Sequence, residues 1–281
     1  MMDSLLLQNA HLRMRVNPQG GGLQELFSLV CGQPVLWDGG DSALFPMLPL
    51  ANRVAGNRFA FQGREIALPQ SPVDERFFLH GDGWQSRWQV ASHSDTTCIL
   101  TLRSRHRCGF DYQAELRYQL REHVLHAELM LTHLGQAPML YGLGFHPWFC
   151  FDARSRLHFS ASGYWPEGEH HLPLAWQSDI PADIDFSTPR HGGDRWLNVG
   201  YSGWNGAARI ERDVMSITIT AQTPWLMLFR MSDKPFLCLE PQSHPVNAHN
   251  MAGQPGLVAL GQGERSHFAM AIAVESAVQS C

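Results

Sequence analysis

Three stretches of the sequence place histidine or glutamate where acid–base chemistry is possible. "YGLGFHPWFC" sets His146 before a proline in an aromatic segment without a charged neighbour, and "FFLHGDGWQSRWQV" sets His80 between apolar residues and glycine. In "FLCLEPQSHPVNAHN", Glu240 directly follows an apolar run. Burying a carboxylate is costly unless it is hydrogen-bonded or used. Taken singly, each residue also fits a structural role, as a core histidine, a turn residue or a strand end that meets solvent.

Metal binding and nucleophilic catalysis are less well supported by the residue spacing. His244 and His249 follow Glu240, but no histidine pair has the i, i+4 helical spacing of a zinc protease, and there is no Cys/His knuckle. The chain has no GxSxG elbow for a serine nucleophile and no glycine-rich phosphate loop that opens a helix. We therefore predict a site without metal and without cofactor.

The elements that must position these residues are β-strands. Residues 110–121, FDYQAELRYQLR, alternate apolar and polar side chains, which predicts a strand with one buried face. The alternation resumes over residues 125–132 after a short polar break, so the two runs indicate an antiparallel hairpin. Two more alternating runs lie at residues 12–16 and 215–220. Two further runs, at 225–229 and 268–274, are apolar on both faces, which is typical of interior strands.

The whole pattern predicts an all-β fold. Helical periodicity is hard to find, and 25 glycines and 17 prolines separate the short runs as turns do. We expect residues 1–281 to form a single domain with two large antiparallel sheets packed face to face. Residues 161–209, rich in Gly, Pro, Trp and His, are expected to form long loops over one end of this sandwich.

Composition and charge indicate which classes of binding partner and which cellular compartment to expect. The net charge of −5 and the lack of a Lys/Arg run argue against nucleic acid and anionic membranes as partners. No stretch approaches the roughly 20 apolar residues of a membrane span, and the run Leu5–Leu7 is too short for a secretion signal. Six scattered cysteines without a CxxC pair, including Cys281, favour reduced thiols and a cytoplasmic protein.

Four motifs in order, over about 200 residues, resemble those of the aldose 1-epimerase or galactose mutarotase-like family. They read "NRVAGNRFAFQGREIAL", "HGDGW", "GFHPWF" and "LEPQSHPVNAHN". The resemblance implies a large antiparallel β-supersandwich, in agreement with the strand pattern. It also implies a cofactor-independent isomerase that interconverts the α and β anomers of a free aldose, and a small-molecule sugar as its partner. Monomer and homodimer both remain open.

The resemblance further implies a role for each matching residue. A base removes the proton of the C1 hydroxyl while an acid protonates the ring oxygen, so that the ring opens and recloses on the other face. The base would be Glu240, the acid His146, and His80 a second histidine at the ring oxygen. A histidine with a pKa near 6.5 suits this task, and we expect it to set the alkaline limb of a bell-shaped rate profile. Arg53 and Asn52 would bind the sugar hydroxyls. Gln242 would support the base, and Trp148 would pack against the sugar ring.

One position departs from the family's pattern. Many members carry a sugar-binding aspartate before a Gly-aromatic segment, where this chain reads "RWLNVGYSGWNG" and aligns Asn198. Either Asn198 holds the hydroxyls there, more weakly than a carboxylate, or another residue such as Asp194 reaches in. If Asn198 does so, Asn198→Asp should tighten binding of the family's usual hexoses by about 1 kcal/mol.

Three alternatives stay open from the sequence alone. A phosphorylated hexose would need cationic residues in the pocket, for which Arg58, Arg76 and Arg87 are available. A non-catalytic carbohydrate-binding protein could keep the fold, although it would not need both Glu240 and His146. A metal-dependent β-sandwich isomerase is the third alternative.

Overall fold

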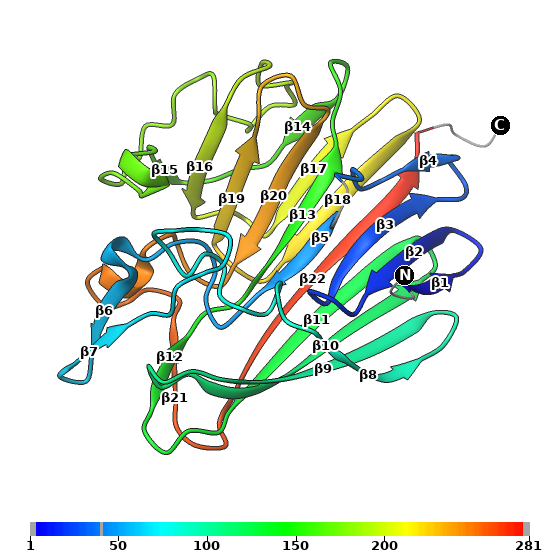
Figure 1. Ribbon diagram of the computed structural model, residues 1–281. Helices are drawn as coiled ribbons and strands as arrows, with labels where there is room; N and C mark the ends of the chain where they lie inside the picture. Colours follow the sequence, from blue (N-terminus) through cyan, green and yellow to red (C-terminus); the bar gives the residue numbers. More distant parts are fainter. Residues whose placement is uncertain (1–3, 40–41, 278–281) are drawn as a thin grey trace.

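The computed structural model describes residues 4–39 and 42–277, and its regular secondary structure is almost entirely antiparallel strand (Figure 1). The first sheet has ten strands. In spatial order, with β4 beside β3, they are β1 (Leu5–Gln8), β2 (Leu12–Asn17), β3 (Gly22–Ser28), β4 (Gln33–Pro34), β5 (Leu44–Met47), β13 (Gly144–Cys150), β20 (Phe236–Gln242), β19 (Trp225–Arg230), β16 (Leu197–Ser202) and β15 (Gly163–Trp165). The prediction of an all-β fold is confirmed.

The second sheet has eight strands. In spatial order they are β14 (Arg156–His158), β17 (Ala207–Glu211), β18 (Met215–Ala221), β22 (Arg265–Ser276), β11 (Val124–His133), β10 (Asp111–Arg121), β9 (Thr97–Arg105) and β8 (Gln89–His93). Two small pairs and three short 3-10 turns complete the fold: β12 (Met139–Tyr141) with β21 (Val258–Leu260), β6 (Arg58–Phe61) with β7 (Arg64–Ala67), η1 (Ala55–Asn57), η2 (Glu169–His171) and η3 (Ala248–Asn250).

The alternating runs form strands with the predicted buried faces. β10 and β11 pair antiparallel with Leu116 opposite Leu129, so the predicted hairpin is confirmed. Tyr112, Leu116 and Tyr118 are fully buried and belong to one hydrophobic cluster that draws on both large sheets. The two runs that are apolar on both faces are interior strands, since β19 lies between β20 and β16, and β22 lies between β18 and β11.

The expectation of long loops over residues 161–209 is wrong in part. This segment contains β15, β16 and the start of β17, and β16 pairs along its whole length with β19. The sequence of β16, LNVGYS, does alternate, with Leu197, Val199 and Tyr201 at the apolar positions, but the run covers only six residues inside a stretch rich in Gly, Pro, Trp and His. The error matters for function because β16 borders the candidate active site.

None of the helices among the described residues is long and apolar enough to cross a membrane. The five described cysteines carry free thiols, and Cys281 lies outside the described residues.

Candidate active site

The register of two neighbouring strands brings the central histidine and glutamate together. Trp148 of β13 pairs with Cys238 of β20 in an antiparallel ladder. His146, two residues before Trp148, therefore lies opposite Glu240, two residues after Cys238. His146 Nε2 is 3.0 Å from Glu240 Oε1, and the two side chains are only 8% and 2% exposed. Residues 94 positions apart thus form a buried cross-strand pair.

Burial determines where the proton of this pair resides. It raises the pKa of Glu240 to about 8, against the smaller opposing effects of the Gln242 hydrogen bond and the Arg53 charge. Burial also lowers the pKa of His146 to about 3. Burial therefore favours the neutral form of each group, that is, a protonated carboxyl group beside a neutral imidazole. Catalysis with Glu240 as base and His146 as acid would need the same number of protons but with the two charges separated.

Gln242 lies behind the carboxyl group on the same strand. Its Nε2 donates to Glu240 Oε2 at 3.1 Å, and its backbone oxygen accepts from Thr223 Oγ1 at 2.5 Å. These bonds fix the carboxyl orientation from the side opposite His146. The first bond favours the ionised form of Glu240, which a general base requires.

Two hydrogen bonds to Asn52 hold His80 beside the Glu240–His146 pair. The His80 N–H donates to the Asn52 carbonyl and the Asn52 N–H donates to His80 Nδ1, each at 3.0 Å. Both residues have left-handed backbone, which Asn and His tolerate better than most residues. Because Nδ1 accepts, the proton of neutral His80 lies on Nε2. Burial, aided by the charges of His146 and Arg53, lowers the His80 pKa well below its usual value and keeps the ring neutral.

Gly81 is needed for the chain to pass close to the neighbouring loop. Its φ is +71°, and a Cβ there would lie 2.0 Å from the Leu48 carbonyl oxygen. No other residue could occupy this position without moving backbone, which explains the glycine directly after His80.

Arg53 extends from the same loop and is tied to the segment that follows β20. Its Nη1 donates to Asn52 Oδ1 at 3.2 Å, and its carbonyl accepts from the Asn247 N–H at 3.0 Å. Asn247 Oδ1 also accepts from the Ala55 N–H at 2.8 Å. The asparagine that trails the Glu-Pro-Gln motif thus positions the arginine loop.

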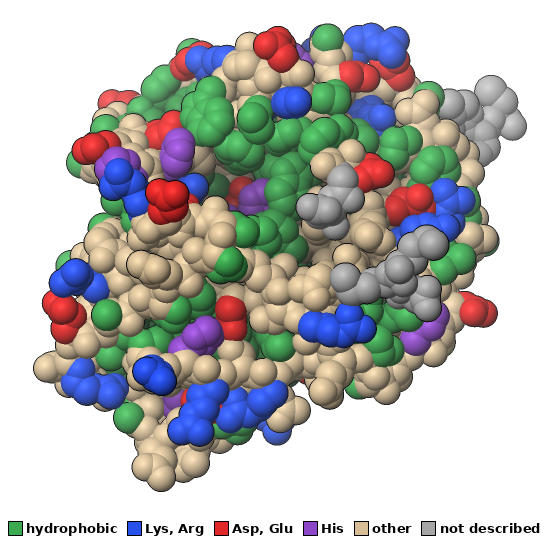
Figure 2. Space-filling view, viewed as in Figure 1, with side chains coloured by type: hydrophobic (Ala, Val, Ile, Leu, Met, Phe, Trp, Pro, Cys, Tyr) green, Lys and Arg blue, Asp and Glu red, His purple; other side chains and the backbone are tan. Residues whose placement is uncertain are grey.

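These residues surround a cavity of about 280 Å³ with aromatic walls. Trp148 stacks on His146 at 4.1 Å between ring centroids, and Phe45 stacks on Trp84 at 4.7 Å. Figure 2 shows this side of the molecule hollowed among hydrophobic side chains, with a histidine deep in the hollow. The lining residues are Phe45, Asn52, Arg53, Leu79, His80, Trp84, His146, Trp148, His171, Trp196, Asn198, Phe229 and Glu240.

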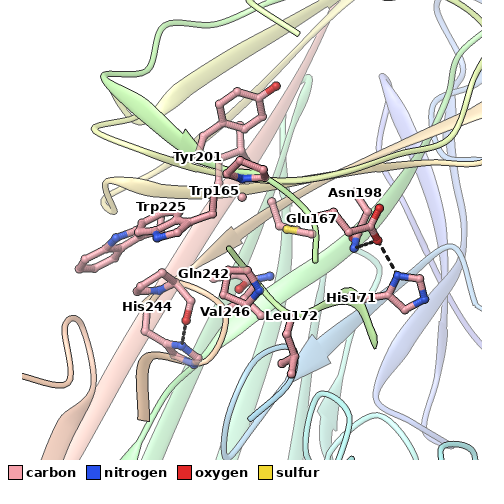
Figure 3. A pocket seen from close by; sticks show the side chains of 16 residues that line it. Trp165, Glu167, His171, Leu172, Asn198, Tyr201, Trp225, Gln242, His244 and Val246 are labelled. Carbon is pink, nitrogen blue, oxygen red and sulfur yellow. Dashed lines mark hydrogen bonds and ion pairs between the residues drawn. The ribbon is translucent and has the colours of Figure 1, made fainter. Parts of the chain in front are cut away.

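Asn198 lies at the edge of this cavity and is held by a carboxylate from another segment. Its Nδ2 donates to Glu167 Oε1 at 2.6 Å, and Glu167 also bonds His171 Nδ1 at 2.5 Å and accepts from Trp196 Nε1 at 2.8 Å. Figure 3 shows Glu167 between Asn198 and His171, where a second, small cavity begins. Because the amide nitrogen is engaged by Glu167, the Asn198 Oδ1 remains as an acceptor. Burial would raise the pKa of Glu167, but its three hydrogen bonds outweigh that effect and lower it.

All but one of the sequence-predicted site residues line the cavity. The exception, Gln242, supports Glu240 from behind and lines the second cavity. Asp194, the alternative to Asn198, is half-exposed, lies 3.7 Å from Arg230 and does not line the cavity, so that alternative is wrong.

The structure also adds residues that the sequence did not reveal. Phe45, Glu167, His171, Trp196 and Phe229 line or support the cavity. Glu167 and His171 lie in the irregular stretch "WPEGEHHLP", where no periodicity indicates direction. The one feature that could have indicated a role in the site is the carboxylate of Glu167 among Trp, Pro and His residues. Phe45 and Phe229 are reached only through strand register, as they lie beside His146 and Cys238.

Comparison with known proteins agrees with the geometry. The aldose 1-epimerase family model matches residues 3–273. The chain belongs to the aldose 1-epimerase family. It is 35% identical to the uncharacterized protein YphB of Escherichia coli K12, over 98% of this chain and 99% of YphB.

Solved structures show the same fold. A crystal structure from Escherichia coli K12, provisionally described as an aldose 1-epimerase, superposes with a TM-score of 0.93 at 34% identity, covering 98% of this chain and all of that one. Galactose 1-epimerase from Lactobacillus acidophilus superposes with a TM-score of 0.79 at 18% identity, covering 96% and 93% of the two chains. The second similarity is a likeness of fold.

Proposed function

We propose that the protein is an aldose 1-epimerase, an isomerase that interconverts the anomers of a free aldose without a cofactor. The observation that carries the proposal is the buried contact between Glu240 and His146, beside a His80 ring whose Nδ1 accepts from the Asn52 N–H so that Nε2 is left to donate. The cavity of about 280 Å³ is near the lower end of the usual range for small-molecule sites, which suits a monosaccharide. Membership of the aldose 1-epimerase family supports the same reaction.

The proposed reaction moves protons without changing their number on the protein. As a sugar binds, the proton of the pair passes from Glu240 to His146 across their contact, and the C1 hydroxyl and ring oxygen of the sugar then take the place of that contact. Glu240 as carboxylate accepts the C1 hydroxyl proton, and His146 as imidazolium gives its proton to the ring oxygen as the C1–O5 bond breaks. The pair is left with one proton, now on Glu240. Rotation about C1–C2 and the reverse transfers reclose the ring as the other anomer.

The neighbouring residues assist at defined atoms. The Nε2–H of His80 is available to donate to the ring oxygen. The Arg53 charge favours the ionised form of Glu240. Trp148, stacked on His146, and Phe45 offer flat apolar surfaces to the sugar's C–H faces.

A free sugar is favoured over a sugar phosphate by the charge of the cavity. Arg53 is the sole arginine or lysine among the described residues that line it. Arg58, Arg76 and Arg87 do not line it. A phosphate group would lack the cluster of cationic partners that usually recognises it.

A purely sugar-binding protein would gain nothing from the buried pair. Burying a carboxyl group and two histidines costs stability, whereas hydroxyl recognition needs only exposed polar groups and aromatic faces. We further propose a cytoplasmic, single-domain enzyme acting as a monomer or homodimer on a small sugar, with neither nucleic acid nor membrane as partner; the free thiols are in keeping with that compartment.

The direct test is polarimetry of freshly dissolved α-anomers of glucose, galactose and two pentoses with purified protein in excess EDTA. At least one sugar should equilibrate faster than its spontaneous rate, and EDTA should not slow it. Spontaneous rates for the whole panel would remove the catalytic proposal. Activity that EDTA abolishes would instead favour a metal-dependent isomerase.

A further inference from the structure

A third potential metal ligand lies beside the acid–base pair. Cys238 precedes Glu240 by two residues on β20, so both side chains lie on the same face of the sheet. One ligand atom each from Cys238, Glu240 and His146 lies within 4.8 Å of the others, and all three residues are buried. Within residues 4–39 and 42–277 this is the one group of three such residues close enough to hold a metal ion. His244, by contrast, uses Nε2 to accept from the Ala51 N–H.

The set matches the ligand preferences of zinc. Tetrahedral Zn²⁺ binds cysteine sulfur at about 2.3 Å and imidazole nitrogen or carboxylate oxygen at about 2.0–2.2 Å. Ligand atoms in such a shell are separated by roughly 3.3–3.8 Å, a simple consequence of those bond lengths. Modest side-chain rotations therefore suffice to close the site, and the adjoining cavity has room for water as the fourth ligand. A thiolate among the ligands selects Zn²⁺ over Mg²⁺ or Ca²⁺.

Charge balance also favours a divalent cation at this buried position. A metal ion binds the deprotonated forms of such ligands, which here are one thiolate, one carboxylate and one neutral imidazole. The two negative charges neutralise the ion, so no net charge is buried.

We propose that Cys238, Glu240 and His146 form an inhibitory site for a thiophilic divalent cation, with Zn²⁺ as the best-fitting ion. The ion takes the place of the proton that the acid–base pair shares, and it occupies the lone pairs of both groups. Neither residue can then exchange a proton with a sugar. In this arrangement the metal is an inhibitor and not a cofactor.

The binding test uses Co²⁺ as a spectroscopic substitute for Zn²⁺ and is independent of activity. Metal-free wild type titrated with Co²⁺ should show a thiolate-to-cobalt charge-transfer band that saturates at one ion per chain and disappears when Zn²⁺ is added. Cys238→Ala should lack the band. Cys98→Ala is the matched control, because Cys98 is also a fully buried free thiol but lies on β9 in the other sheet; it should keep the band. Absence of the band in wild type, or its persistence in Cys238→Ala, would overturn the site.

The inhibition test rests on the proposed epimerase function. Zn²⁺ should inhibit wild type reversibly, with recovery in EDTA, whereas Mg²⁺ should have no effect. Cys238→Ala should keep its basal rate and need at least about tenfold more Zn²⁺ for half inhibition, since even indirect partners of a metal site change affinity by about 10–100-fold. Equal zinc sensitivity in the variant and wild type would refute the proposal. If Cys238→Ala does not fold, Cys238→Ser serves in both tests.

The two proposals fail in different ways. A cobalt band in a protein without anomerisation activity would leave the metal site standing and remove the epimerase proposal. Anomerisation that is insensitive to Zn²⁺, without a cobalt band, would do the reverse.

Discussion

At the scale of single residues, the decisive feature is that Glu240 and His146 are buried against each other. Both are more stable in the neutral form, since each pKa is shifted by desolvation in the direction that removes charge. The motifs predicted the two residues as a pair, but burial depth follows from the complete fold. The assignment of Glu240 as base and His146 as acid therefore did not indicate that burial favours the neutral form of both groups.

The pH profile of the reaction should follow from these shifts. The active pair carries one proton. That proton is lost as pH rises through the raised pKa of Glu240, about 8, and a second proton is added only as pH falls towards the depressed pKa of His146, about 3. We expect kcat/KM, corrected for spontaneous anomerisation, to form a broad plateau with its alkaline limb near pH 8. An alkaline limb near pH 6.5 would support the sequence-based expectation of an ordinary histidine instead.

At the scale of elements, the segment that carries Glu167 changes the expectation for Asn198. The sequence suggested that Asn198→Asp would tighten sugar binding. In the structure the Asn198 amide nitrogen is 2.6 Å from Glu167 Oε1, so an aspartate would bring two carboxylates into contact. We now expect the opposite effect, because like charges at this distance repel and would displace the side chain from the cavity edge.

A charge exchange between the two positions tests this arrangement. Asn198→Asp should raise KM for the best sugar by about tenfold, equivalent to about 1.4 kcal/mol. The double variant Glu167→Gln/Asn198→Asp restores one carboxylate and one amide in contact, and it should recover most of the loss. Steady-state kinetics of the wild type, both single variants and the double variant form a complete cycle. Additive effects of the two substitutions would show that the contact does not position Asn198 for sugar binding.

At the scale of the whole molecule, the sequence predicted what simple periodicity can encode. β10 and β11 were readable because one face of each meets the core and the other meets solvent. β16 was missed although Leu197, Val199 and Tyr201 alternate with less apolar residues, because the run is only six residues long and lies in an otherwise irregular segment.

The same distinction applies to the site. His80, His146 and Glu240 occur in recognisable motifs, whereas Phe45 and Glu167 enter through strand register and through an irregular segment. Neither register between distant strands nor the path of such a segment is determined locally. Gln242 was anticipated as the support of Glu240, whereas the hydrogen bond from Asn52 that orients His80 became visible only in the assembled fold.

The central claim is that the cross-strand pair Glu240–His146 carries the proton transfers of anomerisation. Two-dimensional NMR exchange spectroscopy on the anomers of the best sugar, at equilibrium and in EDTA, measures the catalysed interconversion rate directly. With folded protein verified by thermal denaturation, Glu240→Gln and His146→Asn should each lower this rate by about two to four orders of magnitude, the usual contribution of positioned acid–base catalysis. Exchange at the wild-type rate in either folded variant would contradict the account.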